Sequence, residues 1–400
     1  MVNRHKAALA ALAAGGALVV SACGGSSSGG SAAPKSSSSS SSTSNISYTS
    51  FTTDFSVMKQ LSSVAAAGKG KVGVLLPDTV TSARYVEFDA PYLTKAFETA
   101  GIASSDLTVQ NAHGDNATQV SQAQADITNG ATVLVLDPLT SGVGAQIEKY
   151  AKQHGVAVVD YDRITLGGQR SYYVSFNNVT VGKLIGTGFA DCLTAWKVSK
   201  PTLIEMRGDP TDNNATQFAQ GYDSVIAQHS DWTVAAKPAG TWDPPTALTE
   251  FTQALTAHST VNSAIIPNDN NAAPIASYLQ KHGVKAKTFP LTGQDATSTG
   301  LQNILLGWQC GSVYKPIQIE AQAAAAVALY VRAGQTPPSA LVNATTKDTQ
   351  TGTDVPSVLL VPIWVTTKNM ESTVIHDGAV KASQVCTGSV AAACTAAGIS

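Results

Sequence analysis

The sequence predicts an α/β protein made of two doubly wound parallel-sheet lobes joined by a hinge. Short β-rich apolar runs alternate with segments of helical spacing, a pattern typical of parallel sheets covered by helices. The alternation pauses at a long helical stretch, 179–196, and then begins again, which indicates a second unit of the same kind. About 330 residues follow residue 70, more than one hydrophobic core usually supports.

Each unit has its own predicted strands. Those of the first unit lie at 72–76, 107–110, 132–136, 156–160 and 172–176. Those of the second unit lie at 202–206, 233–236, 264–266 and 288–291. Several helices between them are expected to end at a glycine just past the last turn, at Gly101, Gly130, Gly155 and Gly283.

The first 22 residues have the pattern of a secretory signal peptide. A basic start is followed by an apolar run over 7–20 and by small residues, and this run is short for a membrane span. Val20-Ser21-Ala22-Cys23-Gly24 resembles a bacterial lipobox, in which the cysteine thiol carries diacylglycerol after cleavage just before it. We therefore predict a lipoprotein signal peptide at 1–22, lipidation of Cys23 and a lipid-anchored position on the extracytoplasmic face of the cell membrane. An ordinary signal with an incidental cysteine is the alternative.

A serine-rich stretch follows Cys23. Of the residues from 24 to 50, 14 are serine, and such a segment cannot bury enough apolar surface to offset its ordering entropy. We predict a flexible tether at 23–70.

Charge and motif content exclude several function classes. The formal charge is −2, and without Arg4 and Lys6 of the signal it is 23 − 27 = −4. With no basic run, a nucleic-acid partner is not expected. No C-x-x-C, H-E-x-x-H, P-loop or dinucleotide fingerprint occurs, so we expect neither a metal nor a cofactor.

Four cysteines follow Cys23, namely Cys192, Cys310, Cys386 and Cys394. An even count in an exported protein allows two disulfides with three connectivities. A local pair between Cys386 and Cys394 is one option, and the sequence leaves the pairing open.

Polar and aromatic side chains stand directly after the predicted strands, where open α/β sheets bind ligands. The candidates are Arg84, Tyr85, Asp162 and Arg163 in the first unit and Asn213, Asn214, Trp242, Asn268, Asp269, Asp295 and Lys315 further on. Ser82, Asp212 and Gln294 stand beside them. Carboxylates accept hydrogen bonds, guanidinium and ammonium groups donate them, amides do both, and flat rings cover C–H faces. This mixture suits a neutral polyol.

Each candidate has a structural alternative. These are helix caps for Asn213, Asn214 and Asp295, a turn at Asn268 and Asp269, a solvated pair at Asp162 and Arg163, and packing for Tyr85 and Trp242. Their shared position at one end of the predicted parallel strands favours a binding site.

The chain from Lys71 to about Asp377 resembles the bacterial xylose-binding proteins of sugar ABC importers, within the type I periplasmic binding-protein superfamily. The matching stretches are Ser82-Ala83-Arg84-Tyr85, Asp160-Tyr161-Asp162-Arg163, Tyr173-Val174-Ser175-Phe176-Asn177-Asn178, Gly208-Asp209-Pro210-Thr211-Asp212-Asn213-Asn214-Ala215, Gly293-Gln294-Asp295-Ala296, Val313-Tyr314-Lys315-Pro316 and Val355-Pro356-Ser357-Val358-Leu359-Leu360.

The resemblance implies a role for each candidate. It places Arg84, Asp162, Arg163 and Lys315 on one side of a sugar, Asn213 or Asn214, Asn268 and Asp295 on the other, and Tyr85 and Trp242 against the faces of the ring. It implies a first lobe at 71–178 and 313–345, a second lobe at 179–312 and 346–376, and an Ala-rich tail at 377–400.

The expected function is that of a substrate-binding lipoprotein which closes its lobes on a monosaccharide, D-xylose or a related aldopyranose. The family implies a permease and an ATPase as partners, and we expect a monomer. Tyr85, Pro267 and Asn177 depart from the family pattern and leave xylose, glucose, galactose and arabinose open.

Two other functions remain as alternatives. The first is a sensor that presents sugar to a membrane receptor. The second is a glycosidase with Asp162 and Asp295 as its two carboxylates, which Arg163 disfavours because a neighbouring positive charge keeps a carboxyl ionised.

Overall fold

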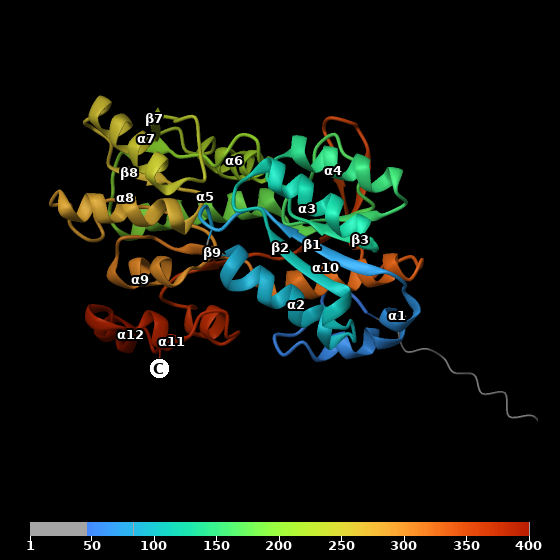
Figure 1. Cartoon of the computed structure of the whole chain (residues 1–400). Coiled ribbons are helices and arrows are strands. Elements are labelled where there is room, and N and C mark those ends of the chain that lie inside the picture. The colour runs from blue at the N-terminus through green and yellow to red at the C-terminus, as the bar shows by residue number, and fades with distance from the viewer. Residues whose placement is uncertain (1–45, 83, 400) are drawn as a thin grey trace, which may run out of the picture. The chain divides into compact units, whose positions relative to one another are not determined.

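The computed structural model describes residues 46–82 and 84–399 (Figure 1). Its first sheet has seven strands in the order β10-β11-β5-β4-β3-β1-β2, all parallel except for the antiparallel pair of β10 and β11. The strands are β1 Lys71–Leu76, β2 Leu107–Asn111, β3 Ala131–Leu136, β4 Ala157–Tyr161, β5 Tyr172–Phe176, β10 Ala344–Lys347 and β11 Asp354–Leu360. The five strands expected in the first unit are therefore present.

Helices cover both faces of this sheet (Figure 1). One face carries α3 (Asn116–Thr128) and α4 (Ser141–Gln153), and the other carries α2 (Ala90–Thr99) and α10 (Ile317–Arg332). The alanine-rich α10 is buried along nearly its whole length because it packs against the sheet, against α2 and against the segment that precedes β1. A π-helical turn, η3 (Tyr85–Asp89), leads into α2, and the short turn η4 (Ser104–Asp106) precedes β2.

The second lobe has a smaller parallel sheet. Strands β6 (Thr202–Glu205), β7 (Thr233–Ala236) and β8 (Ser263–Ile265) lie in the order β7-β6-β8. Single bridges from Ala264 to Leu291 and from Gln294 to Val313 extend this sheet to β9 (Ser312–Tyr314), which pairs with β12 (Ile363–Val365). The expected strand at 288–291 is reduced to the bridge at Leu291. The helices are α5 Asn178–Ala195, α6 Asn213–Ile226, α7 Pro244–Ala257, α8 Asp269–Lys281 and α9 Ser298–Leu306.

The helix ends predicted from glycine are present. Gly101, Gly130, Gly155 and Gly283 have φ values of 100°, 95°, 69° and 81°. Residues with a Cβ rarely adopt this left-handed conformation, so glycine at these positions ends each helix without strain.

Residues 46–70 correct the expected tether, which was predicted to continue to residue 70. They form η2 (Ser56–Leu61) and α1 (Ser62–Ala67), and Phe55, Met58 and Leu61 are buried in the core of the first lobe. The apolar residues recur every three positions, which is a helical spacing that the neighbouring serines obscure. The signal peptide, Cys23 and the first part of the tether lie outside the described residues.

The expected lobe boundaries also need correction near the C-terminus. Residues 346–376 were assigned to the second lobe, yet β11 pairs with β5 in the first sheet, and the chain enters the second sheet only at β12. Residues 313 and 314, assigned to the first lobe, lie in β9 of the second. A β-rich run indicates a strand but does not indicate which sheet the strand joins, so the sequence pattern could not place these crossings.

The expected tail packs against the second lobe. Following η5 (Glu371–Ile375), it forms α11 (Ala382–Val385), η6 (Gly388–Val390) and α12 (Ala391–Ala396) beside α9. Disulfides join Cys386 to Cys394 and Cys192 to Cys310, which settles the connectivity. Within residues 46–82 and 84–399, no helix combines the length and apolar character needed to cross a membrane.

Candidate functional site

A cavity with an empty volume of about 320 Å³ lies where the carboxyl ends of the two sheets face each other. Its lining residues are Thr81, Ser82, Arg84, Tyr85, Asp162, Arg163, Asp212, Asn214, Phe218, Trp242, Asn268, Gln294, Asp295 and Lys315. All of the predicted site residues are in this set except Asn213 and Asp269.

Arg84 is the most heavily bonded side chain of the cavity wall. Its guanidinium donates to both carboxylate oxygens of Asp89 at 2.9 and 2.7 Å, to Asp162 Oδ1 at 2.7 Å and to Glu320 Oε2 at 2.8 Å. Burial would lower the pKa of Arg84, but the three carboxylates outweigh it and raise this pKa above its ordinary value. Arg84 therefore holds Asp162 in place as a fixed, charged acceptor.

Asp162 has an unusual backbone conformation that presents it to the cavity. Its φ of 56° is left-handed, and its carbonyl accepts from Tyr173 Oη, Ser175 Oγ and Asn214 Nδ2 at 2.8–2.9 Å. Burial alone would raise the pKa of Asp162, but the charges of Arg84, Lys315 and Arg163 hold it below its usual range. A strained residue held by this many bonds is typical of a functional site.

Lys315 lies between the two lobes. Its Nζ is 3.3 Å from Asp295 Oδ1 and 3.8 Å from Asp162 Oδ1. Asp295 Oδ1 is buried and accepts no hydrogen bond of good geometry from a described residue, so Lys315 Nζ meets it only as an ion pair. Asp295, whose φ is 86°, accepts a hydrogen bond from Ser82 Oγ at 3.3 Å through its other oxygen. The pair thus retains donors and acceptors for a ligand.

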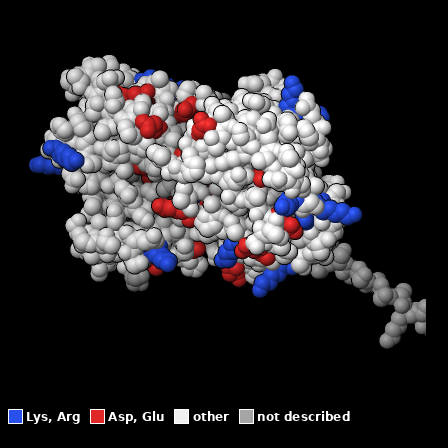
Figure 2. All heavy atoms as spheres, in the orientation of Figure 1, with Lys and Arg blue, Asp and Glu red and all other residues white. Residues whose placement is uncertain are grey.

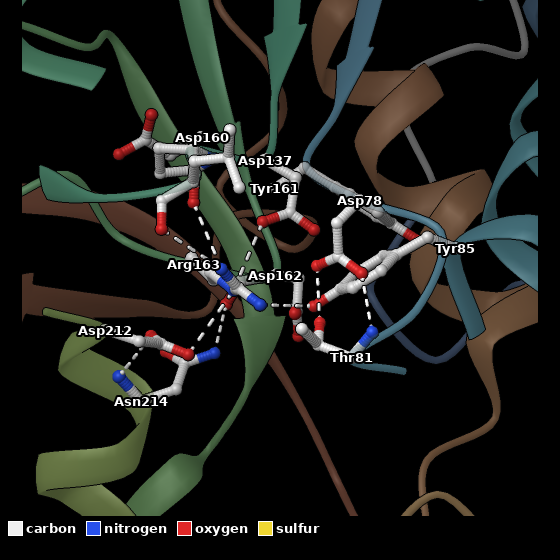
Figure 3. A network of polar contacts seen from close by, with 12 residues as sticks. Asp78, Thr81, Tyr85, Asp137, Asp160, Tyr161, Asp162, Arg163, Asp212 and Asn214 are labelled. Carbon is white, nitrogen blue, oxygen red and sulfur yellow. Dashed lines mark hydrogen bonds and ion pairs between the residues drawn. The ribbon is translucent and has the colours of Figure 1, made fainter. Parts of the chain in front are cut away.

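Arg163 crosses from the first lobe towards the second. Its Nη2 donates to Tyr85 Oη at 2.8 Å, and its Nε lies 3.3 Å from Asp212 Oδ2 in the second lobe and 3.6 Å from Asp137 Oδ1 in its own lobe (Figure 3). Burial raises the pKa of Tyr85, so its hydroxyl stays protonated and can donate in turn.

Asp212 organises the facing wall in the second lobe. It caps α6 by accepting from Asn214 N at 2.9 Å, and it accepts from Trp242 Nε1 at 3.0 Å. The Trp242 ring meets Phe218 edge to face at 6.4 Å and covers Gly208, where a Cβ would lie 2.2 Å from the ring. Trp242 and Phe218 thereby supply the apolar surface of the cavity.

The amide of Asn214 is already used between the lobes. Nδ2 donates to the carbonyl of Asp162 at 2.9 Å, and Oδ1 accepts from Asn178 Nδ2 at 2.8 Å. With the Arg163–Asp212 and Ser82–Asp295 contacts, this bond holds the two lobes together around the cavity.

Asn268 and Gln294 complete the second-lobe wall. Asn268 caps α8 through Oδ1, which accepts from Asn271 N at 2.9 Å. Gln294 donates to the carbonyl of Pro267 at 3.2 Å, and its buried Oε1 has no partner in the described part of the chain. Asn268 is therefore both a helix cap and a cavity residue.

Two predicted residues do not reach the cavity. Asn213 is the first residue of α6, and its side chain lines a separate surface hollow with Thr140 and Gln350. Asp269 is buried behind the site, where it accepts from Gln309 Nε2 at 2.7 Å, Ser312 Oγ at 2.9 Å and Thr297 N at 2.8 Å. Each is adjacent in sequence to a cavity residue, but consecutive residues at a helix start point in different directions.

Five lining residues were not among the predicted set, namely Thr81, Ser82, Asp212, Phe218 and Gln294. Ser82, Asp212 and Gln294 stand beside predicted residues at strand ends, so the same signal could have selected them. Phe218 lies inside α6, where an apolar residue at helical spacing looks like any other core position.

The charged residues of the cavity wall are balanced. Arg84, Arg163 and Lys315 face Asp162, Asp212 and Asp295, and amides and aromatic rings fill the rest. Such a lining can pair every polar group of a small uncharged ligand from two sides while its rings cover apolar faces. On the molecular face in Figure 2, acidic and basic side chains are scattered among uncharged ones.

Comparisons with known proteins agree with this geometry. Residues 72–336 match the family model described as periplasmic binding protein domain. The D-xylose-binding periplasmic protein of Escherichia coli K12 is 34% identical over 331 residues, which cover 81% of this chain and 96% of that protein. The multiple sugar-binding periplasmic receptor ChvE of Rhizobium radiobacter is 30% identical over 80% of this chain and 93% of its own.

Solved structures show the same fold. A solute-binding protein of Clostridium phytofermentans with bound β-D-glucose superposes with a TM-score of 0.70 at 26% identity, over 78% of this chain and 99% of that one. A carbohydrate transporter protein of Chloroflexus aurantiacus in complex with D-glucose gives 0.69 at 25% identity, over 78% and 97%. These relatives are binding proteins rather than enzymes. The chain belongs to the periplasmic binding protein domain family, with the type I fold that its sequence predicts.

Proposed function

We propose that this protein binds one monosaccharide, D-xylose or a related aldopyranose, between its two lobes and delivers it to a sugar ABC importer. The observation that carries the proposal is the balanced polar cavity, in which Asp295 Oδ1 lies 3.3 Å from the Lys315 ammonium and accepts no hydrogen bond of good geometry from a described residue. A buried polar group without a partner costs roughly 1–3 kcal/mol, so a ligand hydroxyl that pairs with it binds favourably.

In this proposal the binding residues are those that line the cavity. Arg84 acts mainly through Asp162, which it holds, while Asp162, Arg163, Asp295 and Lys315 meet hydroxyl groups. Tyr85, Phe218 and Trp242 offer their rings to the C–H faces of the sugar.

The cellular setting is also part of the proposal. The periplasmic relatives support an extracytoplasmic location, and we propose that Cys23 carries the lipid anchor, with a permease and an ATPase as partners. The relative described as a receptor favours presentation to a membrane receptor as the second candidate. Growth of a deletion strain on the bound sugar separates the two, because loss of import slows growth whereas loss of signalling does not.

Titration calorimetry with D-xylose, D-glucose, D-galactose and L-arabinose tests the binding itself. We expect at least one sugar to bind with micromolar or tighter affinity. Asp295→Asn should weaken that affinity by about 25-fold, the equivalent of about 2 kcal/mol, since it removes a charged acceptor for sugar hydroxyls and the closer of the two anionic partners of Lys315.

Asn213→Ala is the matched control, because Asn213 lies outside the cavity and should change the affinity less than about three-fold. The proposal fails if no aldose binds. If both variants bind sugar with the affinity of the unmodified protein, the binding site does not lie in this cavity.

A further inference from the structure

We propose that Asp137 holds Arg163 when the lobes are apart, so that Arg163 passes from Asp137 in its own lobe to Asp212 in the other lobe as they close. The inference rests on the lobe closure of the proposed function. It assigns a positioning role to Asp137, which does not line the cavity.

The geometry places one guanidinium nitrogen between two carboxylates. Arg163 Nε is 3.3 Å from Asp212 Oδ2 and 3.6 Å from Asp137 Oδ1, and Figure 3 shows Arg163 between these two residues. Within the described residues Nε has no hydrogen bond of good geometry to either oxygen. An Nε–H points in one direction, so it can bond well to only one of the two carboxylates at a time.

The rest of the guanidinium is fixed in the first lobe. Nη2 donates to Tyr85 Oη at 2.8 Å, and Nη1 donates to the carbonyl of Leu139 at 3.3 Å. When the second lobe moves away, Arg163 therefore stays behind and loses only Asp212. Its Nε then needs a partner within reach in the first lobe, and Asp137 is already 3.6 Å away.

Asp137 has no other use in the described structure. Asp137 directly follows the last residue of β3. Its side chain is fully buried, and neither of its carboxylate oxygens accepts a hydrogen bond from a described residue. Arg163 is the one described cation within ion-pair distance of it. Burial raises the pKa of Asp137 well above its usual range, as expected for a carboxyl that lacks a close partner while the lobes are together.

Asp212 differs from Asp137, because its carboxylate accepts hydrogen bonds from groups other than Arg163. It keeps its hydrogen bonds from Asn214 N and Trp242 Nε1, both within the second lobe. Opening thus leaves no buried charge without a partner on either side, which keeps the two conformations close in free energy. A buried guanidinium with no partner would otherwise oppose opening.

If Arg163 passes between Asp137 and Asp212, neutralising the two carboxylates in turn should have opposite effects on lobe closure. Asp137→Asn should favour the closed form of the sugar-free protein, because Asp212 becomes the only anionic partner of Nε. Asp212→Asn should favour the open form. A shift towards the binding-competent form tightens the apparent affinity in proportion to its population, so Asp137→Asn should bind sugar at least three-fold tighter and Asp212→Asn more weakly.

The test measures the lobe separation directly. Spin labels carried by non-natural amino acids replace two exposed lysines, Lys152 in α4 and Lys281 in α8, and the distance distribution is recorded by pulsed electron resonance without sugar. We expect the closed population to rise in Asp137→Asn and to fall in Asp212→Asn. In an Arg163→Met background, Asp137→Asn should have no effect on the distribution.

The inference is overturned if Asp137→Asn opens the lobes, leaves their distribution unchanged, or acts equally without Arg163. The distances are recorded without sugar. A failure to bind any aldose would therefore refute the proposed function, but the measured lobe distances would still test the role of Asp137. Asp137→Ser serves as a second uncharged variant if Asp137→Asn does not fold, and the same shift is expected for it.

Discussion

At the scale of single residues, neighbouring side chains in the sequence have different roles. Asn268 faces the cavity, whereas Asp269 lies behind it in a pocket of donors formed by Gln309, Ser312 and Thr297. Both follow the same strand, so the sequence places both near the site. Only the start of α8 decides which side chain points inward.

The first prediction concerns the pH dependence of stability. Burial raises the pKa of Asp269 from its ordinary value of 3.8 to about 7, so between these values the folded protein holds a proton that the unfolded chain releases. Stability therefore falls as the pH rises from about 4 to about 7, by at most about 1.4 kcal/mol per pH unit for one proton. Asp269→Asn should flatten this fall, as measured by urea unfolding at pH 5, 6 and 7.

Glu320, whose pKa burial raises to about 8, contributes a similar fall that remains in the variant. Asp115→Asn is the control, because hydrogen bonds that the Asp115 carboxylate accepts from Thr118 lower the pKa of Asp115 and confine its effect to acid pH. An unchanged slope in Asp269→Asn would contradict the buried position of this carboxyl.

The site could be predicted from the sequence at strand ends and not elsewhere. Arg84, Asp162 and Asp295 could be predicted because polar residues directly after the β-rich runs of parallel sheets gather at one edge of the sheet. The ion-pair partners Asp89 and Glu320 could not be predicted, because they lie inside helical segments and meet Arg84 only after folding. Asp137 follows a strand, but nothing in the sequence distinguishes a carboxylate beside the cavity from one that lines it.

At the scale of elements, alternating patterns predicted the strands and helices well but not the membership of each lobe. The runs at 72–76 and 172–176 are hydrophobic because both faces of a central parallel strand are covered. By contrast, β11 and β12 are separated by only two residues yet join different sheets. Pairing partners distant in the sequence decide that choice.

The second prediction concerns η2 and α1, which precede β1. A chain beginning at Ile46 should be more stable than one beginning at Lys71, because the shorter chain lacks Phe55, Met58 and Leu61 from the core. Burial of each such side chain contributes about 1.5–3 kcal/mol. Gln322 in α10 also donates to the carbonyl of Thr52 at 2.8 Å.

Urea unfolding of the two chains, with the same buffer and detection, measures the difference. We expect the midpoint to fall by the equivalent of several kcal/mol in the chain that begins at Lys71. Equal midpoints would mean that this segment does not form part of the core.

The third prediction compares the two disulfides. Cys192–Cys310 closes a loop of 118 residues and Cys386–Cys394 a loop of 8. By restricting the unfolded chain, the first disulfide should add about 5 kcal/mol to the free energy of unfolding and the second about 2.5 kcal/mol. Replacing both cysteines of each pair by serine, followed by guanidinium unfolding, should show the larger loss for Cys192 and Cys310.

A larger loss for the tail pair would instead indicate that native contacts of the tail outweigh chain entropy. That outcome would make Val385 and Val390, which the tail buries against α9, central to the stability of the second lobe.

At the scale of the whole molecule, the chain passes between the lobes after β5, β9 and β11, so three segments form the connection. The cavity lies between the two sheets, and its wall draws on both. Rotation of the lobes about these segments would open the cavity, and a ligand that contacts both walls would favour the closed form. The family match and the glucose-bound structural relatives fit this arrangement.

A crystal structure with the tightest-binding aldose tests the central claim most directly. The account predicts a single pyranose in the cavity, with hydroxyls bonded to Asp162 and Arg163 of the first lobe, to Asp295 of the second lobe and to Lys315 between them. A sugar bound outside the cavity, or one that contacts only one lobe, would contradict it.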